Sequence, residues 1–125
     1  MKALSVRQPW AQLIADGEKT VEVRSRDTRH RGPLAIHASA KPDTGMAAEC
    51  KGLLFGVVVC IVDVVDSRPL TLADVDPALL PDDWTRSECD GLFAWVLANP
   101  RLVEPVAAKG KLNFWHLEDR EITYL

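Results

Sequence analysis

The sequence predicts a small β-dominated, mixed α+β barrel with short peripheral helices, folded as a single domain over residues 1–125. Its length of 125 residues suits one compact core. Short alternating or β-branched segments recur along the chain, whereas only one clear segment has helical spacing. About six short strands indicate a sheet that curls and closes, because closure removes unpaired strand edges.

The first strand is expected over residues 2–7, and a two-turn helix follows from Pro9 to Asp16. Proline is favoured at the start of a helix, and Gly17 supplies a residue suited to its end. Three apolar side chains share one helical face: Trp10, Leu13 and Ile14.

Two half-buried strands are expected next, over residues 20–25 and 33–40. Both segments alternate, so successive side chains point to opposite faces. Four polar side chains are thereby placed on the two faces away from the apolar residues: Glu22, Arg24, His37 and Ser39.

A possible short helix at 45–51 precedes a β-branched run at 53–65, which is typical of a central strand covered on both faces, with Gly56 bending it. Residues 66–91 contain three prolines and several aspartates and are expected to form an excursion with one or two short helices. Further strands are expected at 92–98, 101–107 and 113–118, the first two joined by a turn at Asn99-Pro100.

The charge is unevenly distributed along the chain. The net charge of −3 argues against an indiscriminate polyanion binder. However, residues 1–41 contain eight basic and four acidic side chains, a local charge of +4 that leaves −7 for the rest. This asymmetry favours a small local anion site over a uniformly basic surface.

The cysteines and apolar runs exclude several classes of protein. The chain has three cysteines: Cys50, Cys60 and Cys89. Their odd number and the absence of a CxxC pair argue against a disulfide framework or zinc site and favour a cytoplasmic location. The longest apolar run, residues 53–62, is about half the length of a membrane-spanning helix. We expect no signal peptide, membrane association, metal or cofactor.

Three motifs occur in order in the first 41 residues: LSVRQPWA at 4–11, GEKTVEVRS at 17–25 and RGPLAIHAS at 31–39. Together they resemble the ASCH domain family, and a weaker resemblance continues through Trp95 and Gly110 to Trp115. The resemblance implies a PUA-like β-barrel with a basic cleft beside the first helix, floored by the strand at 20–25. It also implies RNA or a nucleoside or nucleotide as the ligand.

The candidate ligand-binding residues are Arg7, Gln8, Trp10, Lys19, Glu22, Arg24, Arg31, His37 and Ser39. Arg7 and Gln8 precede a helix N-terminus, where free N–H groups favour anions, although Arg7 could equally pair with an acid. Trp10 is either a core residue or a platform for base stacking. Glu22 and Arg24 form either a simple same-strand ion pair or a cleft pair next to Lys19.

The leading hypothesis is RNA or nucleotide binding, and two alternatives remain. The resemblance also implies a hydrolase, either a ribonuclease or an amidohydrolase of N4-acylated cytidine nucleosides that uses a lysine and, three residues later, a threonine. Lys19 matches the lysine, but Glu22 replaces the threonine, so Ser39 or Thr20 would have to act as nucleophile, or Lys19 and Glu22 would activate water. The second alternative is a non-catalytic protein-interaction module that uses the acidic 66–91 excursion.

Overall fold

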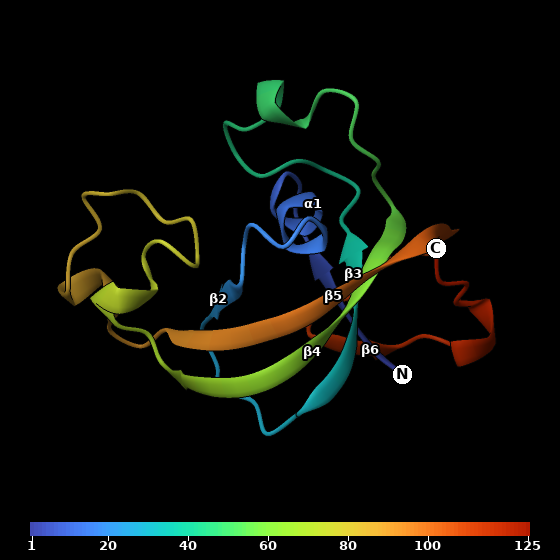
Figure 1. The fold of residues 1–125 in the computed structure, drawn as a ribbon. Coiled ribbons are helices and arrows are strands. Elements are labelled where there is room, and N and C mark those ends of the chain that lie inside the picture. Colours follow the sequence, from blue (N-terminus) through green and yellow to red (C-terminus); the bar gives the residue numbers. More distant parts are fainter.

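The computed structural model describes residues 1–125 and contains one strongly curled sheet with a short helix against its concave side (Figure 1). The strands are β1 (Lys2–Val6), β2 (Val21–Arg24), β3 (Gly32–Ala38), β4 (Val57–Pro69), β5 (Phe93–Ala107) and β6 (Phe114–His116). The only α-helix is α1 (Trp10–Ala15). Short 3₁₀ helices span Ala48–Cys50, Leu72–Asp74, Ser87–Cys89 and Asp119–Glu121.

The six strands are hydrogen-bonded in the order β2-β5-β4-β3-β1-β6. The β1–β3 pair is parallel, and the other four pairs are antiparallel. The long strands β4 and β5 carry the curvature, so β2 and β1 approach each other across the concave side (Figure 1). This half-barrel with few short helices confirms the predicted β-dominated fold.

The core lies on both faces of the central strands. Leu34 and Ile36 of β3 and Val62 of β4 pack with Ile14 of α1 on the concave side. On the other face, Ala35 and Ile61 belong to a second cluster that includes Leu117. Burying each large aliphatic side chain stabilises the fold by about 1.5–3 kcal/mol, and burial on both faces explains why residues 57–62 of β4 are all apolar.

The expectation of two strands joined by a turn at Asn99-Pro100 is wrong, because β5 is continuous from Phe93 to Ala107. Asn99 has a φ of +55° and lies at a bulge, where the pairing shifts between Asp63–Ala98 and Ile61–Arg101. Asparagine tolerates positive φ and proline donates no backbone hydrogen bond, so the pair suits a bulge as well as a turn.

The strand β4 begins and ends later than predicted and runs past Asp66 to Pro69. The excursion therefore covers residues 70–92, and two 3₁₀ helices lie within it. Its apolar residues Leu70 and Ala78 pack against Val21 and Ala94 of the sheet, which fixes it in place. No helix in the structure has the length and apolar character needed to cross a lipid bilayer.

Candidate functional site

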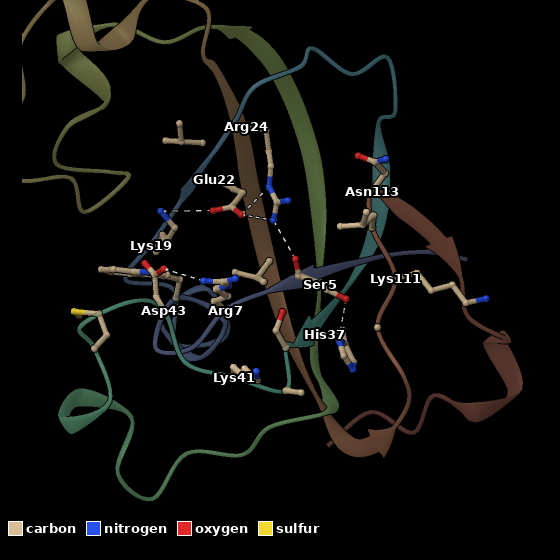
Figure 2. Close-up of a pocket in the computed structure, with 18 of the residues that line it drawn as sticks. Ser5, Arg7, Lys19, Glu22, Arg24, His37, Lys41, Asp43, Lys111 and Asn113 are labelled. Atoms are coloured by element: carbon tan, nitrogen blue, oxygen red, sulfur yellow. Dashed lines mark hydrogen bonds and ion pairs between the residues drawn. The ribbon is translucent and has the colours of Figure 1, made fainter.

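A cleft of about 1370 Å³ opens beside α1, over the edge of the sheet where β1, β2 and β3 approach each other (Figure 2). Its floor comes from β1, β2 and β3, and its walls come from three loops. These are the segment after β3, the excursion at residues 78–81 and the loop 108–113 between β5 and β6.

Lys19, Glu22 and Arg24 form a linked polar group on the floor. Arg24 donates two hydrogen bonds to Glu22 Oε2, of 3.0 Å from Nε and 2.7 Å from Nη2, and a third of 3.1 Å to the Ser5 carbonyl oxygen. Lys19 Nζ lies 3.8 Å from Glu22 Oε1 and donates a 2.6 Å hydrogen bond to the Ala78 carbonyl oxygen. The alternation of β2 therefore places the carboxylate and the guanidinium on one face, as predicted.

Lys19 is buried, with 6% of its surface exposed, and this burial lowers the pKa of its ammonium group. The Glu22 carboxylate opposes the shift, while the Arg24 guanidinium adds to it. An ammonium group that gives up its proton more readily is suited to acid–base work or to nucleophilic attack.

Ser5 and His37 form a second linked pair on the floor. His37 Nε2 lies 2.7 Å from the Ala108 carbonyl oxygen, which can only accept, so Nε2 carries a proton. In the neutral ring Nδ1 is then an acceptor, and the Ser5 hydroxyl donates to it across 3.0 Å. Trp115 Nε1 donates to the same Ser5 oxygen at 3.2 Å. The Ser5 hydroxyl is thus aligned with His37 Nδ1 as a base, and the Ala108 carbonyl oxygen orients the His37 ring.

The loop 108–113 packs directly on this pair. Gly110 sits so close that a Cβ there would lie 2.9 Å from His37 Cε1 and still closer to Ser5 Oγ. Its neighbours Lys109 and Lys111 line the cleft and are exposed. Sequence reasoning missed both lysines; the Lys-Gly-Lys spacing before the last strand was the available signal.

The lining of the cleft is strongly basic. It contains two acidic residues, Glu22 and Asp43, and six basic ones: Arg7, Lys19, Arg24, Lys41, Lys109 and Lys111. Four of the six are exposed at the rim: Arg7, Lys41, Lys109 and Lys111. Among these four only Arg7 has an acidic neighbour, Asp43 at 3.8 Å, so the rim retains uncompensated positive charge.

Most of the predicted site residues line this cleft: Arg7, Trp10, Lys19, Glu22, Arg24, His37 and Ser39. Trp10 packs against the core and also lines the cleft, and its role as a platform for base stacking stays a prediction. Its Nε1 donates a 2.8 Å hydrogen bond to Asp43 Oδ2, and Lys19 Nζ lies 5.7 Å from its ring centroid.

The expectation that Gln8 binds a ligand is wrong, because its side chain is fully buried and does not line the cleft. Its Nε2 donates to the Leu54 carbonyl oxygen at 3.0 Å, and its Oε1 accepts from the Gln12 backbone at 2.9 Å. The side chain therefore occupies a helix N–H that we expected to be free for an anion, and its role is structural.

Arg31 and Thr20 also lie outside the lining of the cleft. Arg31 Nη1 donates to the carbonyl oxygens of Thr28 and His30 at 2.9 and 3.0 Å, so it braces its own loop. Thr20 is exposed, and its backbone pairs with the excursion at Pro77. No group of three or more His, Cys, Asp or Glu side chains is arranged to hold a metal ion.

Comparison with known proteins agrees with this architecture. The family model of the ASCH domain matches residues 4–107. Activating signal cointegrator 1 from Homo sapiens is 34% identical over 94% of the chain, and that from Mus musculus is 32% identical over the same share. The chain spans only 22% of the length of these relatives.

Solved structures share the fold at low sequence identity. The crystal structure of ASCH from Zymomonas mobilis superposes with a TM-score of 0.66 at 16% identity, covering 96% of this chain and 89% of that one. A tyrosine-to-phenylalanine variant of that protein gives the same TM-score and identity, with 91% of its chain covered. From the family match over most of its length, the chain belongs to the ASCH domain family.

Proposed function

We propose that the cleft binds RNA or a nucleotide. The observation that carries the proposal is the contrast in charge: six basic and two acidic residues line the cleft, in a chain whose net charge is −3. A cleft that concentrates one sign of charge attracts an anionic ligand and directs it to that site. The acidic remainder disfavours indiscriminate contact with nucleic acid.

The floor offers groups that suit the edge of a base. Glu22 Oε1 forms no hydrogen bond within the protein and can accept from an exocyclic amine or ring N–H. The Trp10 ring provides an aromatic surface nearby, and the exposed rim lysines can contact phosphate. Reading an unstacked base by hydrogen bonds while cations hold its phosphate is the usual mode for single-stranded RNA.

The experiment is a titration of fluorescently labelled single-stranded RNA, followed by anisotropy, with a Lys109→Ala, Lys111→Ala double variant. We expect affinity to fall about 5- to 30-fold, which corresponds to about 1–2 kcal/mol for two exposed ionic contacts. The slope of log affinity against log salt should also fall by about 0.7 for each phosphate that the variant no longer neutralises. Arg120→Ala is the control, because Arg120 is exposed and lies outside the cleft. Equal affinities for the double variant and wild type would refute the proposal.

A second candidate function is hydrolysis in the same cleft, favoured by the lowered pKa of Lys19 and by the Ser5–His37 pair. Glu22 occupies the position at which the amidohydrolases of the family have threonine, so another nucleophile is needed. Ser5 is the candidate, because its hydroxyl is hydrogen-bonded to His37. In such a reaction Ser5 Oγ attacks the acyl carbon, its proton passes to His37 Nδ1 and then to the leaving amine, and water releases the acid.

The test is incubation with N4-acetylcytidine and, separately, with single-stranded RNA, followed by chromatography. Release of cytidine or of RNA fragments by the wild type, lost in Ser5→Ala and retained in Arg120→Ala, would support hydrolysis. No release by the wild type leaves binding as the function of the cleft.

A further inference from the structure

A second, smaller hollow of about 140 Å³ lies at one end of the cleft. Three residues line both spaces: Arg24, Ser25 and Asn113. Figure 2 shows Arg24 and Asn113 at the same end of the cleft, toward the loop that leads from β2 to β3. The hollow therefore continues the cleft instead of forming a separate site.

Two guanidinium groups and one carboxylate line the hollow, and the Lys2 ammonium lies beside it. Arg26 lines it, is exposed and forms no ion pair. Lys2 is also exposed, and its Nζ lies 4.7 Å from the ring centroid of Phe114, another lining residue. The one carboxylate in the lining, Asp27, accepts hydrogen bonds from the Ser67 hydroxyl and the Thr28 backbone.

The loop that carries Arg26 is held by internal contacts. Trp95 Nε1 donates a 3.0 Å hydrogen bond to the Arg26 carbonyl oxygen. Further along the loop, the Thr28 backbone N–H donates to Ser67 Oγ at 3.2 Å, and Arg31 donates to the Thr28 carbonyl oxygen. The position of the Arg26 backbone is thus fixed before any ligand arrives, which lowers the entropic cost of binding.

The aromatic residues of the hollow are already packed against other groups. The Phe114 ring stacks on Trp95 at 5.4 Å, meets the His30 ring edge at 5.6 Å and lies under Lys2. A base therefore finds no free ring face on Phe114, whereas an anion finds the Arg26 guanidinium, the Lys2 ammonium and the Asn113 amide. This combination suits phosphate.

We propose that this hollow is a phosphate subsite, and that the ligand is a single-stranded RNA of at least two nucleotides, with one nucleotide in the cleft and a neighbouring phosphate at Arg26. This inference rests on the proposed function of the cleft. Arg26 follows Arg24 by two residues in the chain, and Arg24 lines both spaces, so the subsite adjoins the floor of the cleft. A base can enter the cleft only when it is unstacked, which favours a single strand over a duplex.

The experiment measures competition between a labelled hexauridylate and unlabelled uridine monophosphate, diuridylate and hexauridylate. Arg26→Ala is compared with Arg29→Ala, which removes the same charge from the same loop at an exposed residue outside both linings. We expect affinity to rise with length, and Arg26→Ala to weaken the hexamer about 2- to 5-fold without changing the monophosphate. Arg29→Ala should have little effect, and thermal unfolding checks that both variants fold.

Each other outcome has a defined meaning. If Arg26→Ala equals Arg29→Ala, or if the monophosphate competes as well as the hexamer, the subsite is refuted. If the Lys109→Ala, Lys111→Ala double variant still loses affinity in that case, the cleft proposal survives. If duplex RNA competes as well as single strands, the single-strand assignment is wrong. If no ligand binds, both proposals fail.

Discussion

Lys19 Nζ lies 2.6 Å from the carbonyl oxygen of Ala78, and this buried hydrogen bond ties the floor of the cleft to the excursion that forms one wall. The backbone N–H groups of Thr20 and Val21 reinforce the link by donating to Pro77 at 2.9 and 3.2 Å. The same lysine lies within 3.8 Å of Glu22. Lys19 therefore ties the excursion to the floor and also interacts electrostatically with Glu22. The two roles can be separated by their dependence on pH.

Lys19→Met should make the stability difference between wild type and variant depend on pH. Burial lowers the pKa of Lys19 from its ordinary value of 10.5, so the folded state binds fewer protons than the unfolded chain between the lowered pKa and 10.5. The wild type should therefore gain stability relative to the variant as pH rises through this range. Urea unfolding of both proteins from neutral pH to pH 10.5 measures the difference, and a constant difference would contradict the expectation.

Gly110→Ala should weaken RNA binding by moving the loop 108–113. The added methyl group would meet Ser5 Oγ and the His37 ring at less than normal contact distance, so the loop must shift and carry Lys109 and Lys111 with it. We expect a loss of stability of about 1–3 kcal/mol, typical of overpacking, together with lower RNA affinity. Anisotropy and thermal unfolding measure the two effects.

Leu112→Ala is the matched control for the effect of Gly110→Ala on stability. Leu112 belongs to the same loop and is 91% exposed, so its truncation should leave the stability unchanged. If Gly110→Ala binds RNA as tightly as the wild type, Gly110 does not position the loop.

The floor of the cleft was predictable because it depends on local rules. The period of two along residues 20–25 places Glu22 and Arg24 together, and the charge excess in residues 1–41 supplies four of the six cleft cations. Gln8 could not be assigned in this way. The residue type shows that it can hydrogen-bond, but only the fold shows that the Leu54 carbonyl and the Gln12 N–H satisfy it.

The remaining errors have a similar physical origin. Lys109 and Lys111 reach the cleft through long-range pairing, which sequence patterns over short windows do not reveal. Asn99-Pro100 satisfies the requirements of a turn and of a bulge equally, and the continuous pairing of β4 with β5 selects the bulge. Long-range contacts decided each of these outcomes.

Asp74→Asn should destabilise the excursion above the pKa of Asp74 and have little effect in strong acid. Asp74 is 2% exposed, accepts two 2.8 Å hydrogen bonds from Arg68 and caps the Leu72–Asp74 helix through the Thr71 backbone. The Arg68 hydrogen bonds lower the pKa of Asp74 from its ordinary value of 3.8. The stabilisation is therefore present above pH 3.8 and lost as pH falls through the lowered pKa.

The loss for Asp74→Asn near neutral pH should be about 1–2 kcal/mol, as for other helix caps with an ionic partner. Unfolding by urea at neutral and acidic pH measures it against wild type. A variant that is equally destabilised at both pH values would show that packing, not the charge of Asp74, is responsible.

Cys60 should react with thiol reagents only when the whole protein unfolds. It is fully buried in β4, and burial raises the pKa of its thiol to about 12, so the thiolate is scarce at mildly alkaline pH and also inaccessible. Iodoacetamide labelling with site mapping by mass spectrometry, repeated at increasing urea concentration, compares Cys60 with the other two free cysteines, Cys50 and Cys89. The urea dependence of Cys60 labelling should match that of global unfolding, because no local opening of the excursion exposes a central strand. Labelling of Cys60 at low urea, at a rate similar to that of Cys89 in the excursion, would show that the sheet opens locally.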